Sequence, residues 1–295
     1  MPGLVVVNPH SGPCETSVGE VAAAFPGSRV HEITGKDVLP QIRAAIREDT
    51  EFVAVAGGDG TLRCAANVLA GTDLPLLPVP AGTRNHFARE VGITNLGDAS
   101  RAAGGRRRRI DVGEVNGEVF VNNAGIGIYP RILRRRKADE KHMPKALATL
   151  AAVWVDLRNF HRFTVTVEDH PYRAWMVFVG NGRYGQSLFD VTERGSLDSG
   201  LLDVRVLRAD RALARLRTVA ALVSGRADSS PMAVFDEVRD IELRLDRAEA
   251  DVALDGEIVR LRSPLVFRCR PAALTVLVPP GDAGAGDASA GGTGA

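Results

Sequence analysis

One stretch near the start of the chain constrains its fold most strongly: an apolar run that passes directly into a glycine-rich turn. Residues 52–56 are apolar, Gly57-Gly58-Asp59-Gly60-Thr61 follows, and a helical pattern begins at Leu62. Glycines let the backbone approach an anion closely, and the start of a helix presents free N–H groups. The stretch therefore predicts a strand, a phosphate-binding loop and a helix.

The same alternation runs through about the first 105 residues. Strand-like runs occur at 4–7, 29–33, 52–56 and 76–79, with helical spacing between them. This alternation predicts a parallel, doubly wound α/β sheet whose ligand lies at the carboxyl ends of the strands. The loops expected at those ends contain glycine, asparagine, threonine and aspartate.

After residue 105 the pattern changes to short strands separated by turn residues. Asn116-Gly117 suits a type I′ hairpin turn, and Asp255-Gly256 links two further strands. We expect a β-sandwich domain with helical insertions at about 144–159 and 211–223. The predicted boundaries are 1–108 for the α/β domain, with 271–280 as a candidate to rejoin it, 109–270 for the β-rich domain, and 281–295 for a disordered tail.

Composition narrows the function classes. The 295 residues include 37 Lys and Arg and 36 Asp and Glu, so the overall charge does not favour a nucleic-acid partner. Cys14, Cys64 and Cys269 have no metal-type spacing and fit the reduced thiols of a cytoplasmic protein. No apolar run approaches the ~20 residues that span a bilayer, and the chain enters a strand-like run at Leu4 without a signal peptide. We expect any membrane contact to be peripheral.

Three further motifs occur with the glycine turn in a fixed order. Asn8-Pro9-His10-Ser11-Gly12 follows the first strand, Pro80-Ala81-Gly82-Thr83-Arg84-Asn85 follows the fourth, and Leu254-Asp255-Gly256-Glu257 stands near the end of the β-rich part. Together they resemble the diacylglycerol kinase catalytic domain family, which includes bacterial soluble lipid kinases and is related to the sphingosine and ceramide kinases. The resemblance covers about residues 3–279.

The resemblance implies an ATP-binding α/β domain similar to that of NAD kinase and phosphofructokinase, a β-sandwich for the lipid, and a site between them. It implies nucleotide contacts at Asn8, Pro9, Ser11, Gly12, Thr34, Gly57, Gly58, Gly60, Thr61 and Thr83, with Asn85 as a further candidate. Asp59 is expected to hold the Mg²⁺ that accompanies ATP, because a carboxylate repels phosphate and binds hard cations.

The resemblance also implies that Glu257 is the general base, which takes the proton from a lipid hydroxyl as that oxygen attacks the γ-phosphorus of ATP. A carboxylate suits this role in a partly desolvated cleft, where its pKa moves toward neutrality. Asp255 either assists it or caps the turn. We therefore expect a cytoplasmic lipid kinase that works transiently at a membrane surface, with diacylglycerol as the leading acceptor. A homodimer is left open.

Three places depart from the family pattern. Arg63-Cys64 stands where relatives commonly have Asn-Glu, and Arg84 and His86 stand where bacterial members have Gly and Asp. Ser199 stands where some bacterial members have the carboxylate ligand of a structural Mg²⁺, so Asp198 is the remaining candidate ligand there.

Two other functions stay open: an NAD kinase, which shares the glycine turn, and a non-catalytic nucleotide- or lipid-binding protein, which the departures would fit. The basic residues between 131 and 145 precede an apolar stripe at 147–157 and have two interpretations. They form either a segment that docks on an anionic membrane or a surface loop followed by a core-packing helix.

Overall fold

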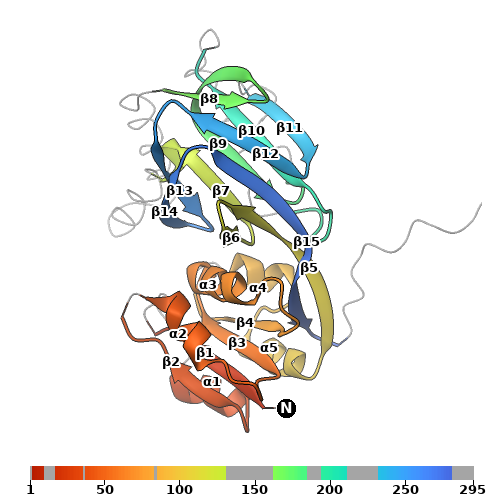
Figure 1. Cartoon of the computed structure of the whole chain (residues 1–295). Coiled ribbons are helices and arrows are strands. Elements are labelled where there is room, and N and C mark those ends of the chain that lie inside the picture. The colour runs from red at the N-terminus through yellow and green to blue at the C-terminus, as the bar shows by residue number, and fades with distance from the viewer. Residues whose placement is uncertain are drawn as a thin grey trace, which may run out of the picture. The chain divides into compact units, whose positions relative to one another are not determined.

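The computed structural model describes residues 2–9, 17–35, 37–82, 85–130, 162–184, 194–210 and 232–280. The predicted helical insertions, the basic segment 131–145 and the tail 281–295 lie outside these residues. Contacts divide the chain into two units, whose elements are labelled in Figure 1. Met1–Gly58, Leu74–Arg108 and Val276–Ala295 form the first unit, and Asp59–Asp73 and Arg109–Thr275 form the second.

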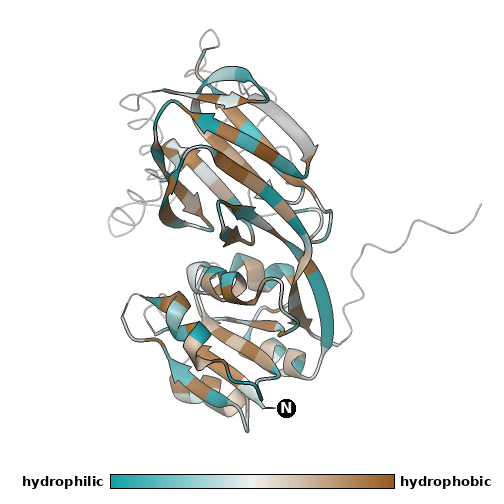
Figure 2. Ribbon diagram, in the orientation of Figure 1, coloured by the Kyte–Doolittle hydropathy of each residue, from teal (hydrophilic) through white to brown (hydrophobic). Residues whose placement is uncertain are grey.

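The first unit contains a parallel sheet. Its strands are β1 (Gly3–Val7), β2 (Arg29–Glu32), β3 (Phe52–Gly57), β4 (Leu76–Pro80) and the end of β15 (Leu265–Val278). They lie in the order β2-β1-β3-β4-β15, and every pair is parallel. β1 and β3 are buried along their whole length, and Figure 2 colours β1 mainly hydrophobic, as expected for strands covered on both faces. The predicted parallel α/β sheet is confirmed.

Helices α1 (Val18–Ala24), α2 (Val38–Ala45), α4 (His86–Glu90) and α5 (Leu96–Ala103) belong to the same unit. Their starts are set by local sequence. Ser17 Oγ accepts from the Glu20 N–H at 3.2 Å while the Ser17 N–H donates to Glu20 Oε2 at 2.7 Å, which is a capping box. Asn95 caps α5, because its side-chain oxygen accepts from the Asp98 N–H at 2.9 Å.

The second unit contains α3 (Asp59–Leu69) and most of the strands. These are β5 (Arg106–Val115), which begins in the first unit, β6 (Glu118–Phe120), β7 (Asn123–Gly127), β8 (Phe163–Val167), β9 (His170–Asn181), β10 (Leu202–Arg208), β11 (Met232–Val238), β12 (Asp240–Leu245), β13 (Glu249–Leu254) and β14 (Glu257–Arg262). One limb runs β14-β13-β7, the other runs β8-β12-β15-β5-β6, and both join β9, which also pairs with β10.

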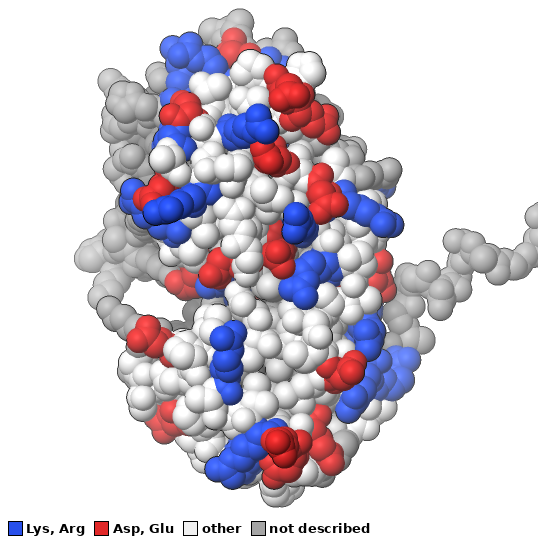
Figure 3. Space-filling view, viewed as in Figure 1, with Lys and Arg blue, Asp and Glu red and all other residues white. Residues whose placement is uncertain are grey.

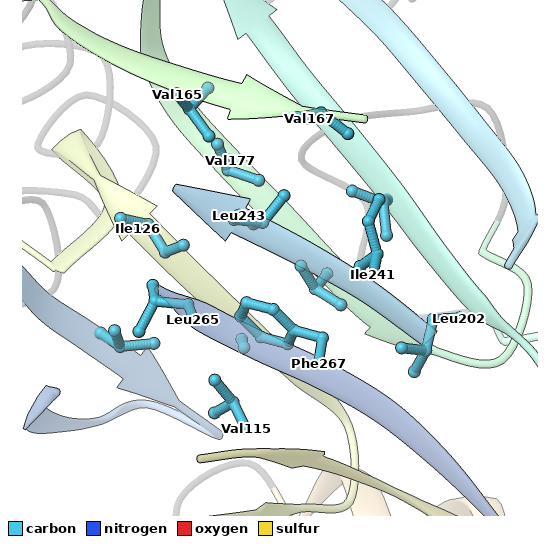
Figure 4. Packing of buried hydrophobic residues seen from close by; sticks show 14 of the residues in the cluster. Val115, Ile126, Val165, Val167, Val177, Leu202, Ile241, Leu243, Leu265 and Phe267 are labelled. Atoms are coloured by element: carbon cyan, nitrogen blue, oxygen red, sulfur yellow. The ribbon is translucent and has the colours of Figure 1, made fainter. Parts of the chain in front are cut away.

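The core of the second unit lies between these limbs. Alternate residues of the strands point into it, including Val165, Val177, Leu243 and Leu265, which Figure 4 shows converging with Phe267. All five are essentially inaccessible to solvent. Burial of apolar side chains from two facing sets of strands is the main stabilising contribution of a sandwich-like domain, so the second part of the fold prediction is confirmed as well.

Both predicted hairpin turns are present. Asn116 and Gly117 have φ of 49° and 88°, and Asp255 and Gly256 have φ of 48° and 89°. Positive φ at both central residues defines the type I′ turn, which matches the twist of the flanking strands. The second of these turns places Glu257 at the first position of β14.

β15 differs from the sequence pattern, which indicates two separate runs at 265–269 and 274–278. The structure has one strand of 14 residues. Ala272, at φ 50°, lies in its middle and donates its N–H to Asp111 Oδ1 at 2.8 Å. Beyond this point Val276 pairs with Leu76 of β4 in the first unit.

Candidate active site

The first unit brings several predicted nucleotide residues to the carboxyl ends of adjacent strands. β1 and β3 are neighbours in the sheet. From β1 the chain adds β2 on one side, and from β3 it adds β4 on the other side, so the direction in which strands are added changes between β1 and β3. The Asn8 N–H, just past β1, donates to the Ala56 carbonyl of β3 at 2.9 Å, and the Asn8 side chain is mostly buried. In open α/β sheets such a switch point is where a ligand binds.

The glycine turns after β3 and β4 touch through their backbones. A Cβ at Gly82 would lie 2.5 Å from the Cα of Gly58, so no side chain fits there. Asn85 holds the second turn, because Gly82 N–H donates to its Oδ1 and its Nδ2 donates to the Gly82 carbonyl, both at 2.8 Å. Asn85 itself has φ 50°. These contacts make Asn85 a residue that orients the loop.

Thr34 follows β2, the strand at the edge of the sheet. Its N–H donates to Gln41 Oε1 at 3.0 Å, and Gln41 Nε2 donates to the Thr34 carbonyl at 2.8 Å. Gln41 of α2 thus fixes the backbone of Thr34 and leaves the residue exposed. Pro9 is described but half-buried, whereas the predicted contacts Ser11, Gly12 and Thr83, together with Arg84, lie outside the described residues.

Helix α3 begins at Asp59, three residues before the start predicted at Leu62. Asp59, Gly60 and Thr61 are therefore its first turn, where N–H groups have no intrahelical partner and a negative charge is favourable. Thr61 is buried and Asp59 is half-buried. Gly57 and Gly58, which precede the helix, belong to the first unit, whereas the helix groups with the second.

Glu257 lies against the start of this helix. A Cβ at Gly60 would be 2.8 Å from Cγ of Glu257 and 3.1 Å from its Oε1, so the side chain occupies the space that the glycine leaves open. The residue as a whole is exposed. The structure therefore brings together Asp59, Gly60, Thr61 and Glu257, which are about 200 residues apart in the chain.

Asp255 holds the turn that carries Glu257. Its Oδ2 accepts from the Val121 N–H at 2.8 Å, and its Oδ1 accepts from the N–H groups of Asn122 and Asn123 at 2.8 and 3.0 Å. Removal from water raises the pKa of Asp255 to about 6, while the three N–H groups and the positive charge of Arg63 act in the opposite direction. Near pH 7 the group is thus ionised and accepts all three bonds.

The loop that supplies these N–H groups is held from its other side. The Val121 carbonyl accepts from Arg194 Nη1 at 2.7 Å and from Asn181 Nδ2 at 3.0 Å. The Asn122 carbonyl accepts from the Tyr184 hydroxyl at 2.9 Å. Both faces of the loop are therefore fixed, which limits the movement of the Asp255 turn.

Arg63 also belongs to this site. In the sequence it stands out only because it departs from the family pattern. It is 7% exposed, and its Nη1 lies 3.0 Å from Glu118 Oε2. The neighbouring Cys64 has a raised pKa, because burial disfavours the thiolate and the charges of Glu257 and Glu118 add to the effect. The raised pKa lowers the reactivity of the Cys64 thiol.

A metal that arrives with a nucleotide needs few ligands from the protein. No group of three or more His, Cys, Asp or Glu side chains that could hold a metal occurs in the described ranges. Mg²⁺ is commonly bound by one or two carboxylates plus substrate phosphates, and Asp59 can supply one such carboxylate.

No helix in the described part of the chain is long and apolar enough to cross a membrane.

Asp198, the candidate ligand for a structural Mg²⁺, lies in an exposed loop before β10. Its carboxylate accepts from Ser196 Oγ, and the loop is tied down by the Gly200 N–H, which donates to Asp111 Oδ2 at 2.6 Å. With Ser199 beside it, this donor set does not suit a hard cation.

Charges on the molecular surface are of both signs. Figure 3 shows Lys and Arg side chains interspersed with Asp and Glu side chains over the face in view. This agrees with the net charge of +1.

Comparison with known proteins gives two family matches. Residues 2–115 match the diacylglycerol kinase catalytic domain, and residues 128–278 match the YegS C-terminal NAD kinase beta sandwich-like domain. A Pseudomonas fluorescens protein named "Probable lipid kinase YegS-like" is 31% identical over 253 residues, covering 82% of each chain. A Pseudomonas aeruginosa protein of the same name is 32% identical over 248 residues, covering 81% of this chain and 80% of its own.

Two kinds of solved structure share the fold. One is a crystal structure from Bacillus anthracis str. Sterne with a provisional diacylglycerol kinase assignment, with a TM-score of 0.72, 24% identity and 95% coverage of both chains. The other is an NAD kinase from Archaeoglobus fulgidus in complex with ATP, with a TM-score of 0.54, 12% identity, and coverage of 94% of this chain and 93% of its own. These likenesses confirm the predicted fold class.

Proposed function

Because the chain belongs to the diacylglycerol kinase catalytic domain family, whose matching relatives are named probable lipid kinases, we propose that it transfers the γ-phosphate of MgATP to the hydroxyl of diacylglycerol. The product would be phosphatidic acid. The observation that carries the proposal is the contact between the Glu257 side chain and Gly60, because it sets a carboxylate beside the first turn of a helix that follows a glycine loop.

In the proposed reaction Glu257 accepts the proton of the lipid hydroxyl. The hydroxyl oxygen forms a bond to the γ-phosphorus, the bond from that phosphorus to the bridging oxygen breaks, and ADP leaves. A positioned general base contributes roughly 10²- to 10⁴-fold to such a rate. Most of the remaining acceleration in phosphoryl transfer comes from positioning and charge stabilisation.

Other residues would bind and orient the nucleotide. Backbone N–H groups of Gly57, Gly58 and the first turn of α3 are suited to phosphate oxygens, since no side chain obstructs them. Asp59 would hold the Mg²⁺ that, when bound with ATP, screens the phosphate charge. Asn8 and Thr34 follow neighbouring strand ends and are the further candidates for nucleotide contact.

We propose that the protein meets its lipid at a membrane surface, from the cytoplasmic side and without a nucleic-acid partner. What supports this is the family of lipid kinases and the balanced charge of the chain. NAD is the competing acceptor, and only the fold favours it. An assay must therefore compare acceptors directly.

The test is a radiolabelled-ATP assay with diacylglycerol, other hydroxyl lipids and NAD, the lipids in mixed micelles, with and without Mg²⁺. We expect labelled phosphatidic acid that requires both Mg²⁺ and the diacylglycerol micelles. Labelling of NAD alone would replace the proposal by NAD kinase activity. ATP binding without labelling of any acceptor would leave a nucleotide-binding protein.

A further inference from the structure

Arg63 stands one helical turn after Gly60 and is buried in the second unit. Only 7% of its surface is exposed, and its Nε, also buried, has no hydrogen-bond partner among the described residues. Burying a guanidinium with an unsatisfied N–H is costly. Its partner Glu118 has a side chain that is 35% exposed. Such an ion pair adds little net stability, and the better-attested use of a pair with a buried member is to fix the register of the elements that it joins.

The pair that Arg63 makes joins α3 to β6. Its Nη1 donates to Glu118 Oε2 at 3.0 Å and lies 3.5 Å from the Val119 carbonyl. Asn67, one turn further along α3, donates to the same Glu118 oxygen at 3.3 Å. Residues 60, 63 and 67 follow the i, i+3, i+7 spacing of one helix face, so Glu118 is bound to the face that also carries Gly60.

From β6 the contacts lead back to the same helix. β6 runs into the loop at Val121, and the N–H groups of this loop bind Asp255. Two residues after Asp255, the Glu257 side chain lies against Gly60. The contacts thus form a closed ring: α3, the ion pair, β6, the loop, the turn, and α3 again. The Arg63–Glu118 pair is the link in this ring in which two charged side chains bind each other, and Asn67 supports it at the same Glu118 oxygen.

We propose that Arg63 and Glu118 are positioning residues whose ion pair sets the placement of the Glu257 carboxylate over the first turn of α3. The proposal rests on the proposed function of Glu257 as the base. A misplacement of about 1 Å can cost about 10²-fold in rate. The pair would therefore affect turnover, whereas nucleotide affinity, which depends on other groups, would change little.

The first experiment measures steady-state kinetics of diacylglycerol phosphorylation for Arg63→Met, Glu118→Gln and the double variant. We expect each single change to lower kcat by about 10- to 100-fold, with KM for ATP within about 2-fold of the parent. The double variant should be no slower than the slower single variant, because both changes break one interaction. Glu114→Gln, which breaks the 3.1 Å pair with Arg270, is the matched control and should keep kcat.

The second experiment does not use activity. Gly60→Cys and Glu257→Cys, introduced together with Cys64→Ser, place two thiols at the contact, where a Cβ at residue 60 would be 2.8 Å from the Glu257 Cγ. Glutathione disulfide oxidises the two thiols to a disulfide and is itself reduced. We expect closure to slow at least about 10-fold when Arg63→Met or Glu118→Gln is added, because disulfide geometry is narrow.

The two experiments separate the two proposals. A parent protein that phosphorylates no lipid overturns the proposed function, and the disulfide rates still decide whether the pair positions residue 257. An active parent whose Arg63→Met and Glu118→Gln variants keep both kcat and the closure rate overturns the positioning role alone. Should Arg63→Met fail to fold, Glu118→Gln, which keeps the size of the side chain, decides both measurements.

Discussion

The glycine turns of the first unit and the hairpin turn of the second are built by opposite means. Gly58 and Gly82 meet through backbone atoms, with no room for a Cβ. The Asp255–Glu257 turn is instead held by side chains, through three N–H bonds to one carboxylate. A backbone-built site is sensitive to volume and indifferent to charge, whereas a side-chain-built site is sensitive to charge and hydrogen bonding. Substitutions that add volume therefore test the glycine turns, and substitutions that change charge or hydrogen bonding test the hairpin turn.

The largest effect is expected from Glu257→Gln, which changes charge at nearly constant volume. Loss of the general base should lower kcat by roughly 10²- to 10⁴-fold. ATP affinity, measured by calorimetry, should stay within about 2-fold, since every residue proposed to bind the nucleotide or its Mg²⁺ is unchanged. Undiminished turnover in this variant would remove Glu257 from the mechanism and leave the hairpin turn a structural element.

Gly82→Ala tests the backbone-built turn. The new Cβ would lie 2.5 Å from the Gly58 Cα, and a backbone atom cannot move aside as a side chain can. We expect loss of measurable ATP binding and a lower unfolding free energy by about 1–3 kcal/mol. Gly104→Ala is the matched control, since its Cβ would meet no atom within 4 Å and its stability should not fall. Normal ATP binding by Gly82→Ala would contradict the tight packing of the two turns.

Gly60→Ala tests the place where a glycine backbone meets a functional side chain. Its Cβ would meet the Glu257 side chain, which can rotate away, so the fold should tolerate the change. The cost should appear as a kcat reduced by about 10-fold with ATP affinity little changed, because the base is displaced. Chemical denaturation and steady-state kinetics on one preparation would distinguish a displaced base from a folding defect. In a folding defect, the unfolding free energy and kcat would fall together.

The smallest expected effect is a pH dependence of stability due to Asp255. Burial raises its pKa from 3.8 to about 6, so the folded state holds this proton more tightly than the unfolded state does. Its contribution to stability is thus complete below about pH 4 and is lost as pH rises through 6, by roughly 1 kcal/mol between pH 5 and 7. Urea unfolding of the parent and of Asp255→Asn at both pH values should show the difference between them shrinking as pH rises.

The same contrast explains how far the sequence predicts the molecule. Features set by local chemistry are predictable, such as the glycine turns, the Asn116-Gly117 and Asp255-Gly256 hairpins, and the parallel sheet of the first unit. The start of α3 at Asp59 differs from the start predicted at Leu62, because glycine and threonine are poor helix formers and the helix begins inside the turn motif.

Contacts between residues that are far apart in the sequence are harder to predict. A charged residue on a helix is expected at the surface, so nothing in the sequence around Arg63 indicates its burial. Its partner Glu118 is 55 residues away, on a strand of three residues. The family motifs indicate Glu257, but its contact with Gly60 depends on how the strands of the second unit pair.

The path of β15 bears on how the chain folds as it is made. β4 is complete at Pro80, yet its second neighbour in the sheet is the segment of β15 around Val276, about 200 residues later in the chain. While the polypeptide is being synthesised, β4 is thus an apolar strand with one unpaired edge, the feature that invites pairing with another chain. Such a long-range parallel pairing forms slowly. Synthesis and docking of the end of β15 is therefore the step that closes this edge of β4 and ends its exposure to aggregation.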